Sequence, residues 1–447
     1  MTDRYVDVLV AGGSVAGIAT AAALREFGYS VLIVEPGQRL ERRLAGELIH
    51  PLGIAGLQEL DLFDRQAFAT AASIEGFAVF PEAGSAGSRI VLPYGEHERS
   101  VPYAMAVDYP VLRRNLAAAV RRLDHVTVLD GARVTGIDTS DAMAPRVAVE
   151  AEGKTQVFSC RMIVGADGAS SPVRTLAGIG HTRRNLSTIA GYVIDGASLP
   201  APGFGHVLIG GSSVVLAYEI GEARVRVMFD QPIDHDSVLP CQYRRDLLAS
   251  LPAPFRDQVA TAMNRQKALT YRSAEIIAHA TSRGSIVLVG DAGGSCHPLT
   301  ATGMTVGIRD AIRLRDALRM HNGNLADAVM HYDVNRRRAQ RSRLMVASAL
   351  HDVCSRQDPE ARVLRAGLLR YWQDPASRPA TMAILAMTDD RITSAFWHFF
   401  RVMWHGLVDH WQGQRSERFA RFRITAQLIA ALGAMTIKQA NLSIKAR

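Results

Sequence analysis

The residues with the most recognisable chemistry lie near the start of the chain. An apolar run, Asp7–Ala11, has the length and valine content of a buried strand, and it is followed by Gly12, Gly13, Ser14 and Gly17. Gly12 permits a tight turn, and Gly17 permits close packing of a helix on the strand. The first backbone N–H groups of such a helix are unpaired and attract a pyrophosphate. The spacing therefore predicts a dinucleotide site, with Ser14 in place of the usual middle glycine.

An acidic residue completes this motif. A second apolar run, Ser30–Val34, ends at Glu35. A carboxylate in this place accepts hydrogen bonds from the hydroxyl groups of an adenosine ribose, and it would repel the 2′-phosphate of NADP. The unit therefore favours FAD or NAD as its ligand.

Two later apolar runs also end in a glycine and an aspartate. Met162–Ala166 leads into Asp167 and Gly168, and Ile286–Val289 leads into Gly290 and Asp291. Ligands of α/β sheets bind beyond the carboxyl ends of the strands, where turns from several strands meet. We therefore expect all three turns to form one cofactor site.

Taken together, the three turns resemble the single-component flavin monooxygenases built like p-hydroxybenzoate hydroxylase, whose sequences carry GxGxxG, GADG and GD…P…GxGM motifs. The resemblance implies that the cofactor is FAD and that Asp291 binds its ribitol chain. It also implies that Asp167 and Gly168 lie near the cofactor and the path of the nicotinamide.

The same resemblance assigns a role to the segment after the third motif. The turn that contains Pro298 and ends at Gly303 and Met304 is expected to present backbone N–H groups to the N1/C2=O edge of the flavin. Reduced flavin carries negative charge at this edge, and a helix N-terminus stabilises that charge.

Longer stretches resemble the squalene epoxidases. Arg43–Leu48 with Pro51 is similar to their R-x-x-G-E-L…P segment, and His297–Val306 is similar to their H-P-L-T-G-G-G-M-T-V run. The similarity extends over nearly the whole chain. It implies that Arg43 contributes to the FAD site and that the substrate is apolar.

Some positions depart from these patterns. Ala301–Thr302 replaces a glycine pair, and His50 stands where squalene epoxidases usually have glutamine. Tyr109 occupies a position where the wider family often carries an arginine that contacts FAD, so we expect either Arg113 or Arg114 to supply the charge. The substitutions beside the flavin leave the identity of the substrate open.

The order of the runs predicts an α/β chain with an α+β insertion. We expect a Rossmann-type FAD-binding domain, an inserted and mostly antiparallel substrate domain, and a helical C-terminal region. The FAD-binding domain is assigned to residues 1–75, 100–180 and 275–345. The substrate domain is assigned to residues 76–99 and 186–274, and the helical region to residues 346–447.

Composition and cysteine spacing narrow the class of protein. Of 447 residues, 48% are hydrophobic and 21% are charged, which is typical of a globular chain with a large core. The four cysteines have no spacing typical of a zinc site, so no metal site is predicted, and their usage fits a reducing cytoplasm. The basic run Arg336–Arg338 is interpreted as a solvated helix face and not as a nucleic-acid site.

The net charge of +8 is concentrated at the C-terminus. Residues 415–447 hold seven basic residues and one acidic residue around an apolar stretch, Ile424–Ile437, of 14 residues. Spanning a bilayer takes about 20 residues. We expect this tail either to make peripheral contact with an anionic inner membrane surface or to pack on the body as an amphipathic helix.

The resemblances imply a reaction. Reduced flavin would react with O2 to give a C4a-hydroperoxide that transfers one oxygen atom to an isoprenoid or an aromatic lipid, by epoxidation or hydroxylation. The electrons would come from NADPH, NADH or a separate reductase partner. The chemistry belongs to the cofactor, so no catalytic acid–base pair is assigned. His297 and His50 are the pocket candidates near the flavin, and Tyr218 is a further candidate for the substrate pocket.

Three alternatives stay open at this point. Flavin halogenases and prenyl reductases act on similar molecules, but both rely on tryptophan motifs in the middle of the chain. The four tryptophans here, at positions 372, 397, 404 and 411, are all C-terminal. The third alternative is a non-catalytic flavoprotein on a membrane surface.

Overall fold

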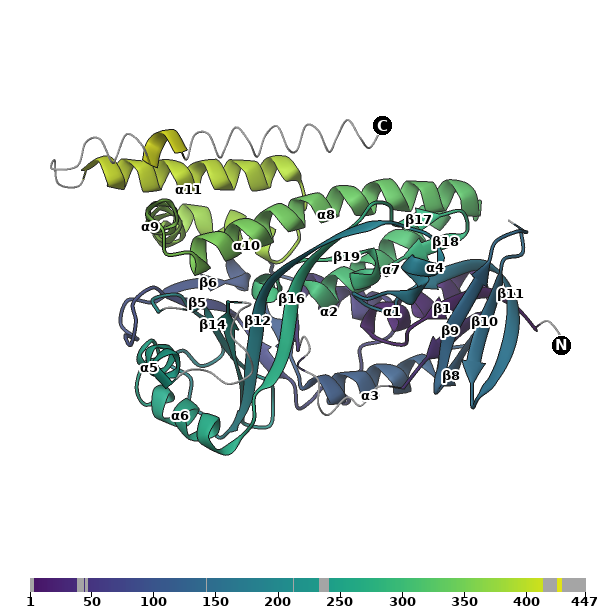
Figure 1. Cartoon of the computed structure of the whole chain (residues 1–447), viewed down its shortest axis with the longest axis horizontal. Helices are drawn as coiled ribbons and strands as arrows, with labels where there is room; N and C mark the ends of the chain where they lie inside the picture. The colour runs from purple at the N-terminus through teal and green to yellow at the C-terminus, as the bar shows by residue number, and fades with distance from the viewer. Residues whose placement is uncertain are drawn as a thin grey trace.

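The computed structural model describes residues 4–37, 44, 47–141, 143–211, 213–232, 241–412 and 424–427. Two large sheets lie next to each other along the molecule, and helices cover them (Figure 1). A third, small sheet joins three short strands. Figure 1 shows the N-terminus at the end of the molecule formed by the first sheet.

The first sheet has eight strands, and its central five run parallel. The apolar runs of four of these strands are buried on both faces, as a parallel sheet requires, whereas the fifth, β8 (Val126–Asp130), is partly exposed. In spatial order these five strands are β18 (Ile286–Leu288), β11 (Lys154–Gly165), β1 (Arg4–Ala11), β2 (Val31–Glu35) and β8 (Val126–Asp130). The other three strands are antiparallel to their neighbours: β17 (Ser282–Arg283), β9 (Ala132–Asp138) and β10 (Arg146–Ala151).

Helix α1 (Val15–Leu24) packs between this sheet and helix α7 (Gly303–Met320). Every residue of α1 except Ala16 is buried, which explains why its sequence is alanine-rich and lacks a polar face. Further short elements complete this part: η1 (Arg25–Phe27), α2 (Pro51–Glu59), α3 (Tyr109–Val120), α4 (Pro172–Leu176), η4 (Gly290–Gly293) and η5 (Pro298–Thr300).

The second sheet also has eight strands, antiparallel except where β13 pairs with β5. Its order is β19 (Gly294–Ser295), β16 (Leu269–Ala278), β12 (His181–Asp195), β15 (Arg224–Gln231), β14 (Val215–Glu219), β13 (Gly205–Leu208), β5 (Gly76–Phe80) and β6 (Ile90–Pro93). The small sheet contains β3 (Leu48–Ile49), β7 (Ala104–Ala106) and β4 (Ala72–Ile74), and η3 (Tyr94–Glu96) follows β6.

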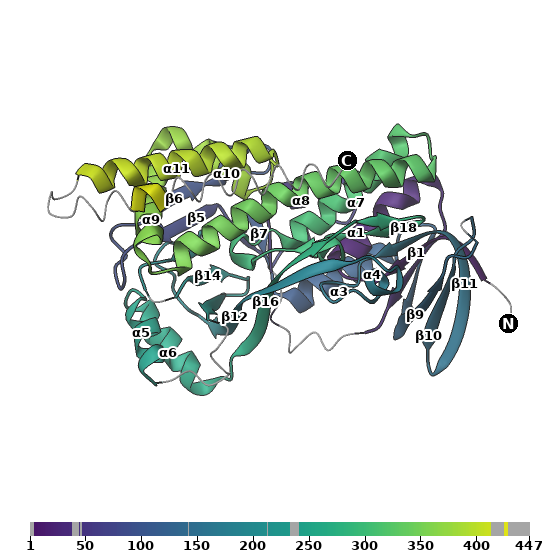
Figure 2. The ribbon, with the colours of Figure 1, turned by 45° about the horizontal axis from the view of Figure 1, so that its top comes forward.

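Helices cover both faces of the second sheet. Helices α5 (Cys241–Ala249) and α6 (Phe255–Arg265) lie on one face, as Figures 1 and 2 show. The other face packs against the C-terminal helices. The sequence predicted strands in this region and did not predict α5 or α6.

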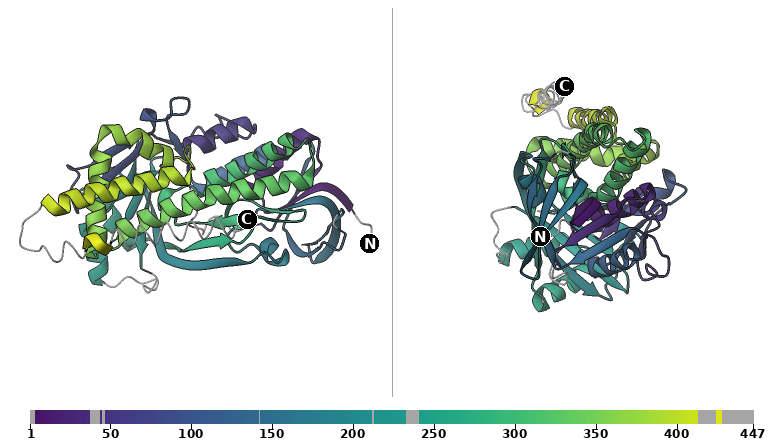
Figure 3. Two further views of the ribbon diagram at one scale, coloured as in Figure 1. Left: turned by 90° about the horizontal axis from the view of Figure 1, so that it is seen from above. Right: turned by 90° about the vertical axis from the view of Figure 1, so that its right-hand side faces the viewer.

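The C-terminal helices are α8 (Leu325–Ser355), α9 (Pro359–Gln373), α10 (Arg378–Leu385) and α11 (Ile392–Gln412), with η6 (Pro375–Ser377) between α9 and α10. Helix α8 spans both sheets, and α11 lies above α9 (Figures 1 and 3). Within the described residues, no helix is both long enough and apolar enough to cross a membrane.

The architecture confirms the predicted fold class: a parallel α/β unit with an inserted, mostly antiparallel sheet and a helical C-terminal region. The domain boundaries proposed from the sequence stay a prediction. β16 runs without a break across the proposed boundary at residue 275.

Candidate functional site

The first motif forms a tight turn from β1 into α1. Gly12 has a φ of +102°, and a Cβ atom there would lie 2.5 Å from the carbonyl oxygen of Ala166. A Cβ atom on Gly17 would lie 1.8 Å from the carbonyl oxygen of Gly12. Larger residues therefore fit at neither position. The Ser14 side chain does not cap α1, so the first N–H groups of the helix stay available to an anion such as a pyrophosphate.

Glu35 and Arg113 lie together beside this turn. Glu35 accepts a hydrogen bond of 2.6 Å from the N–H of Gly13, and Nη2 of Arg113 lies 3.5 Å from its other oxygen. Arg113 is buried, and its Nε and Nη1 atoms have no hydrogen-bond partner among the described residues. Buried guanidinium donors usually have partners. The unused donors therefore fit a bound nucleotide, as expected for a residue that compensates for Tyr109. Arg43 lies outside the described residues.

The second motif stabilises its own turn. The carboxylate of Asp167 accepts hydrogen bonds from the Ser171 hydroxyl (2.5 Å) and the N–H of Val173 (2.8 Å). Burial raises the pKa of Asp167, although these hydrogen bonds oppose the shift. Gly168, with a φ of +83°, has open space where a Cβ atom would point. Arg174 donates to the carbonyl of Ala292 (2.8 Å) and so joins this turn to the third motif.

The third motif is held by a buried ion pair. Asp310 on α7 accepts a hydrogen bond of 2.9 Å from the N–H of Gly290 and lies 3.1 Å from Nε of Arg336. Arg336 also donates to the carbonyls of Gly290 (2.8 Å) and Gly293 (2.9 Å). The interpretation of the Arg336–Arg338 run as a solvated face is wrong for its first residue, because Arg336 is 1% exposed. Asp291, the expected ribitol ligand, lies inside the turn that these contacts hold.

The turn between η5 and α7 forms the other end of the site. Ala301 has a φ of 50°, and no side chain caps the N-terminus of α7 after Thr302. A Cβ atom on Gly303 would meet no atom within 4 Å, so space remains in front of the helix N-terminus. Pro298 begins η5, and Met304 packs partly buried against the core of the first sheet. The geometry suits a planar ring that carries negative charge.

His50 links this turn to the second sheet. Its Nε2 atom lies 2.9 Å from the carbonyl oxygen of Thr300, and its Nδ1 atom lies 2.8 Å from the Tyr94 hydroxyl. The ring therefore donates from Nε2 and accepts at Nδ1. His50 and Tyr94 are both fully buried, and burial lowers the pKa of His50 to about 4. The imidazole is thus a neutral positioning group for the turn, and sequence reasoning missed its partner Tyr94.

Tyr218, which the sequence analysis named as a candidate for the substrate pocket, contacts a buried ion pair. Its hydroxyl lies 3.4 Å from a carboxylate oxygen of Glu47, which pairs with Arg226 at 2.5 Å. All three side chains are buried. This contact ties the segment before β3 to the second sheet.

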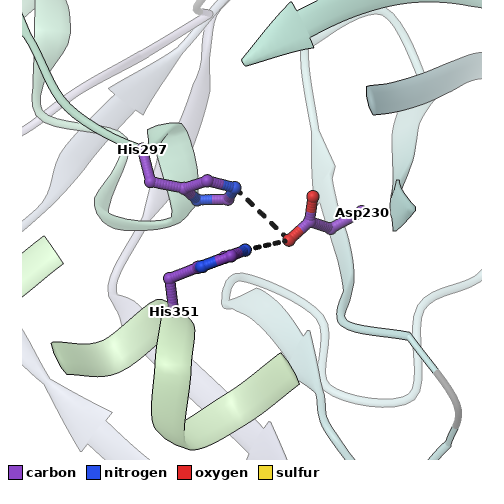
Figure 4. A group of neighbouring side chains, drawn as sticks. All are labelled: Asp230, His297 and His351. Carbon is purple, nitrogen blue, oxygen red and sulfur yellow. Dashed lines mark ion pairs between the residues drawn. The ribbon is translucent and has the colours of Figure 1, made fainter. Parts of the chain in front are cut away.

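His297 lies at the junction of three elements. It precedes η5, and its Nε2 atom is 3.3 Å from a carboxylate oxygen of Asp230 at the end of β15. Nε2 of His351 on α8 is also 3.3 Å from that oxygen, as Figure 4 shows. Asp230 and His351 were not predicted as site residues, because the three residues are far apart in the sequence.

An apolar pocket lies among the C-terminal helices. The empty space within and over it, open solvent included, is about 620 Å³. Met345, Val346, Ala349, Leu350, Val353, Leu368, Tyr371, Trp372, Thr381, Ile384, Leu385, Ala395, His398, Phe399 and Val402 line it. The sequence analysis named Tyr218 of the substrate domain as a candidate for the substrate pocket, whereas this pocket is built by α8 to α11 and is not lined by Tyr218. In the sequence this pocket corresponds to an apolar face on each helix. Helices that pack into a filled core have the same pattern, so the sequence does not distinguish the two.

One hydrophobic cluster joins the lining of the pocket to η5 and the turn that leads from η5 into α7, which we call the flavin-side turn. Val353, Tyr371 and Val402 of the pocket belong to the same buried cluster as Tyr94. Leu299 of η5 packs against this cluster. The apolar pocket and the predicted flavin site therefore share one core.

Comparison with known proteins places these features in a family. A profile described as FAD binding domain matches residues 5–349. Squalene epoxidase erg1 of Aspergillus fumigatus is 26% identical over 424 residues, which cover 89% of this chain and 85% of that protein. Squalene epoxidase 3 of Arabidopsis thaliana is 25% identical over 90% of this chain and 78% of its own length.

Solved structures show the same fold. PqsL, a probable FAD-dependent monooxygenase from Pseudomonas aeruginosa, superposes with a TM-score of 0.66 at 22% identity over 79% of this chain and 97% of its own. The p-nitrophenol 4-monooxygenase PnpA from Pseudomonas putida gives a TM-score of 0.68 at 18% identity over 90% of this chain and 99% of its own.

Proposed function

The chain belongs to the FAD binding domain family and is an FAD-dependent monooxygenase, and from this premise we propose that it inserts one atom of O2 into a hydrophobic isoprenoid or aromatic lipid. The proposal concerns the substrate class and the route of oxygen transfer. Its main support is the apolar pocket among α8 to α11, which shares a hydrophobic cluster with the turn beside the flavin site.

The residues of this chain fit FAD at both ends. The α1 N-terminus and Gly12 would receive the pyrophosphate, while Glu35 and Arg113 would contact the adenosine half. Asp291 and the uncapped N-terminus of α7 would receive the ribitol and the flavin ring. When bound and reduced, the flavin supplies the O2-activating chemistry, and the chain supplies position, dryness and electrostatics. Transfer through the flavin C4a position, as expected from the sequence, is part of the proposal.

The pocket lining favours a substrate without charge. Most of its residues are aliphatic or aromatic, and burying apolar substrate area there yields about 25 cal/mol per Å². Its polar groups include the Tyr371 hydroxyl, which lies 2.9 Å from Nδ1 of His398. Burial lowers the pKa of His398, so this pair presents neutral hydrogen-bonding atoms. One hydroxyl or carbonyl group on an otherwise apolar substrate would match it.

We also propose a source of electrons and a peripheral contact with a membrane. NADPH, NADH or a separate reductase would reduce the flavin, as expected from the sequence. The sequence analysis proposed peripheral membrane contact through the tail at 415–447. Except for residues 424–427, this tail lies outside the described residues. Support comes instead from α11, where Trp397, Trp404 and Trp411 are spaced seven residues apart and are 62%, 58% and 46% exposed. Tryptophan side chains favour the membrane–water interface.

A panel of substrates tests the proposed class. The FAD-loaded enzyme with reductant is offered polyprenyl alkenes, aromatic lipids and small charged aromatics, and the products are weighed by mass spectrometry. The proposal expects a gain of one oxygen atom in an apolar lipid. Turnover confined to small charged aromatics would overturn it.

A further inference from the structure

None of Asp230, His297 and His351 is among the residues that line the apolar pocket, and the cluster that they form adjoins both that pocket and the flavin-side turn. His297 leads into η5 of the flavin-side turn, and His351 follows Leu350, which lines the pocket. Asp230 comes from the second sheet. Three separate parts of the fold thus contribute one titratable side chain each to a single point.

The geometry of the cluster is centred on one carboxylate oxygen. Both imidazole Nε2 atoms lie 3.3 Å from Oδ2 of Asp230, and Figure 4 shows both rings directed at it. The ring centroids are 4.1 Å apart. The exposed fractions of the His297, Asp230 and His351 side chains are 2%, 9% and 15%. The cluster is therefore nearly buried, and His351 is its most exposed member.

Two histidines and an aspartate can also bind a divalent metal ion. The tautomer of His297 distinguishes a metal-binding site from a site that holds a proton. Nδ1 of His297 accepts a hydrogen bond of 3.2 Å from the N–H of Leu299. In the neutral ring the proton is therefore on Nε2, the atom that faces Asp230 and lies 3.0 Å from the Ser187 hydroxyl. A metal ion would need the Nε2 lone pair and a proton on Nδ1. The hydrogen bond from the N–H of Leu299 to Nδ1 therefore favours a proton, and not a metal ion, at Nε2 of His297.

The charges of the cluster limit it to one added proton. Burial raises the pKa of Asp230, but hydrogen bonding to His297 and His351 outweighs burial and holds that pKa well below its usual range. Burial lowers the pKa of His297, and Asp230 opposes this. Two cationic rings at 4.1 Å would repel each other. Other titratable groups facing the cluster are Tyr243 of α5, near Asp230, and Asp352, 3.9 Å from Nδ1 of His351.

We propose that Asp230, His297 and His351 form a proton-holding site for oxygen transfer, loaded from solvent through His351. This inference rests on the proposed function. In each turnover one atom of O2 enters the substrate and the other leaves as water. Reduced nicotinamide, or a reductase, supplies two electrons, and with a nicotinamide hydride the balance requires one proton from solvent. The cluster takes up that proton at His351 and places it beside His297, next to the flavin-side turn. Asp230 and His351 act as positioning residues in this scheme.

The test compares His351→Gln with His331→Gln, a control on the same helix outside the cluster. Glutamine keeps a hydrogen-bonding group at position 351 but cannot take up or release a proton. It would therefore preserve function if the role of His351 were only structural. We expect His351→Gln to keep its FAD content and its rate of flavin reduction. The share of reductant that yields oxygenated product should fall about 10²-fold, with H2O2 formed instead, and the pH profile of this share should change. The control should match the wild type.

A second measurement needs no turnover. Nitrogen-15 NMR of the histidines should find His297 as the Nε2–H tautomer, and Asp230→Asn should lower the pKa of His297. An unchanged product share and pH profile in His351→Gln would overturn the proposal. So would an Nδ1–H tautomer of His297, or one equivalent of Zn²⁺ or Co²⁺ bound by the wild type and lost in Asp230→Asn. If the wild type gave no oxygenated product at all, the proposed function itself would fail, and this inference with it.

Discussion

Arg336 of α8 reaches the turn of the third motif and donates a hydrogen bond of 2.8 Å to the carbonyl of Gly290. It also pairs with the buried carboxylate of Asp310, so a residue 46 positions after Gly290 holds the predicted ribitol site in place. The conformation of the turn that carries Asp291 therefore depends on tertiary contacts as well as on the local sequence.

The first prediction follows from this contact. Arg336→Ala leaves the charge of Asp310 buried with Arg313 as its remaining ion-pair partner among the described residues, and removal of one partner from a buried pair costs about 3–5 kcal/mol. We expect a lower free energy of unfolding and a reduced FAD content after purification. Denaturant unfolding and flavin absorbance measure both. The exposed Arg338→Ala is the control, and it should change stability by less than about 0.5 kcal/mol. Equal behaviour of the two variants would contradict the assigned role.

A second prediction concerns pH and His50. Its pKa is about 4 in the folded protein and about 6.5 when unfolded, so the unfolded state binds more protons between these values. The contribution of the neutral ring is fully present above pH 6.5 and is lost as the pH falls toward 4. We expect His50→Gln, which keeps hydrogen-bonding groups, to show a shallower loss of stability over this range. His206, with a similar pKa of about 4, stays in both proteins. Identical slopes for the two proteins would refute the assignment.

A third prediction tests the apolar pocket. Ala349→Phe would fill part of the cavity, whereas Ala326→Phe places the same side chain on an exposed position of the same helix. We expect the first variant to lose at least about tenfold in turnover of a lipid substrate while it keeps its FAD, and the second to behave as the wild type. Steady-state kinetics with absorbance of the bound flavin measure both effects. If the two variants turn over lipid equally well, the substrate binds elsewhere.

A fourth prediction addresses the exposed face of α11. Trp404→Ala should weaken binding to liposomes by at least about tenfold, because burial of a large aromatic side chain contributes about 1.5–3 kcal/mol. Tyr5→Ala removes an aromatic side chain of similar exposure on β1 and serves as the control. Co-sedimentation with vesicles gives the affinity. Unchanged sedimentation of Trp404→Ala would show that this face does not contact membrane.

The parts of the site that depend on local geometry could be predicted from the sequence. The Gly12–Gly17 turn and Glu35 have fixed spacings within one βαβ unit, and the structure places them in contact. The expected compensation by Arg113 is also compatible with its place beside Glu35.

Other parts depend on tertiary contacts that no spacing reveals. Arg336 lies in a basic run typical of an exposed helix face, and only the packing of α8 on the third motif buries it. Asp230 and His351 meet because the end of β15 faces the end of α8. The apolar pocket forms between four helices whose apolar faces look the same as those of a filled core.

Labelled oxygen shows directly whether the enzyme inserts one atom of O2 into an apolar lipid. The FAD-loaded enzyme is incubated with reductant and a lipophilic alkene or aromatic lipid under ¹⁸O2, and the product is weighed. We expect a product that carries one ¹⁸O atom, with the second atom recovered in water. A product that has gained two hydrogens and no oxygen, or chlorine when chloride is supplied, would contradict it.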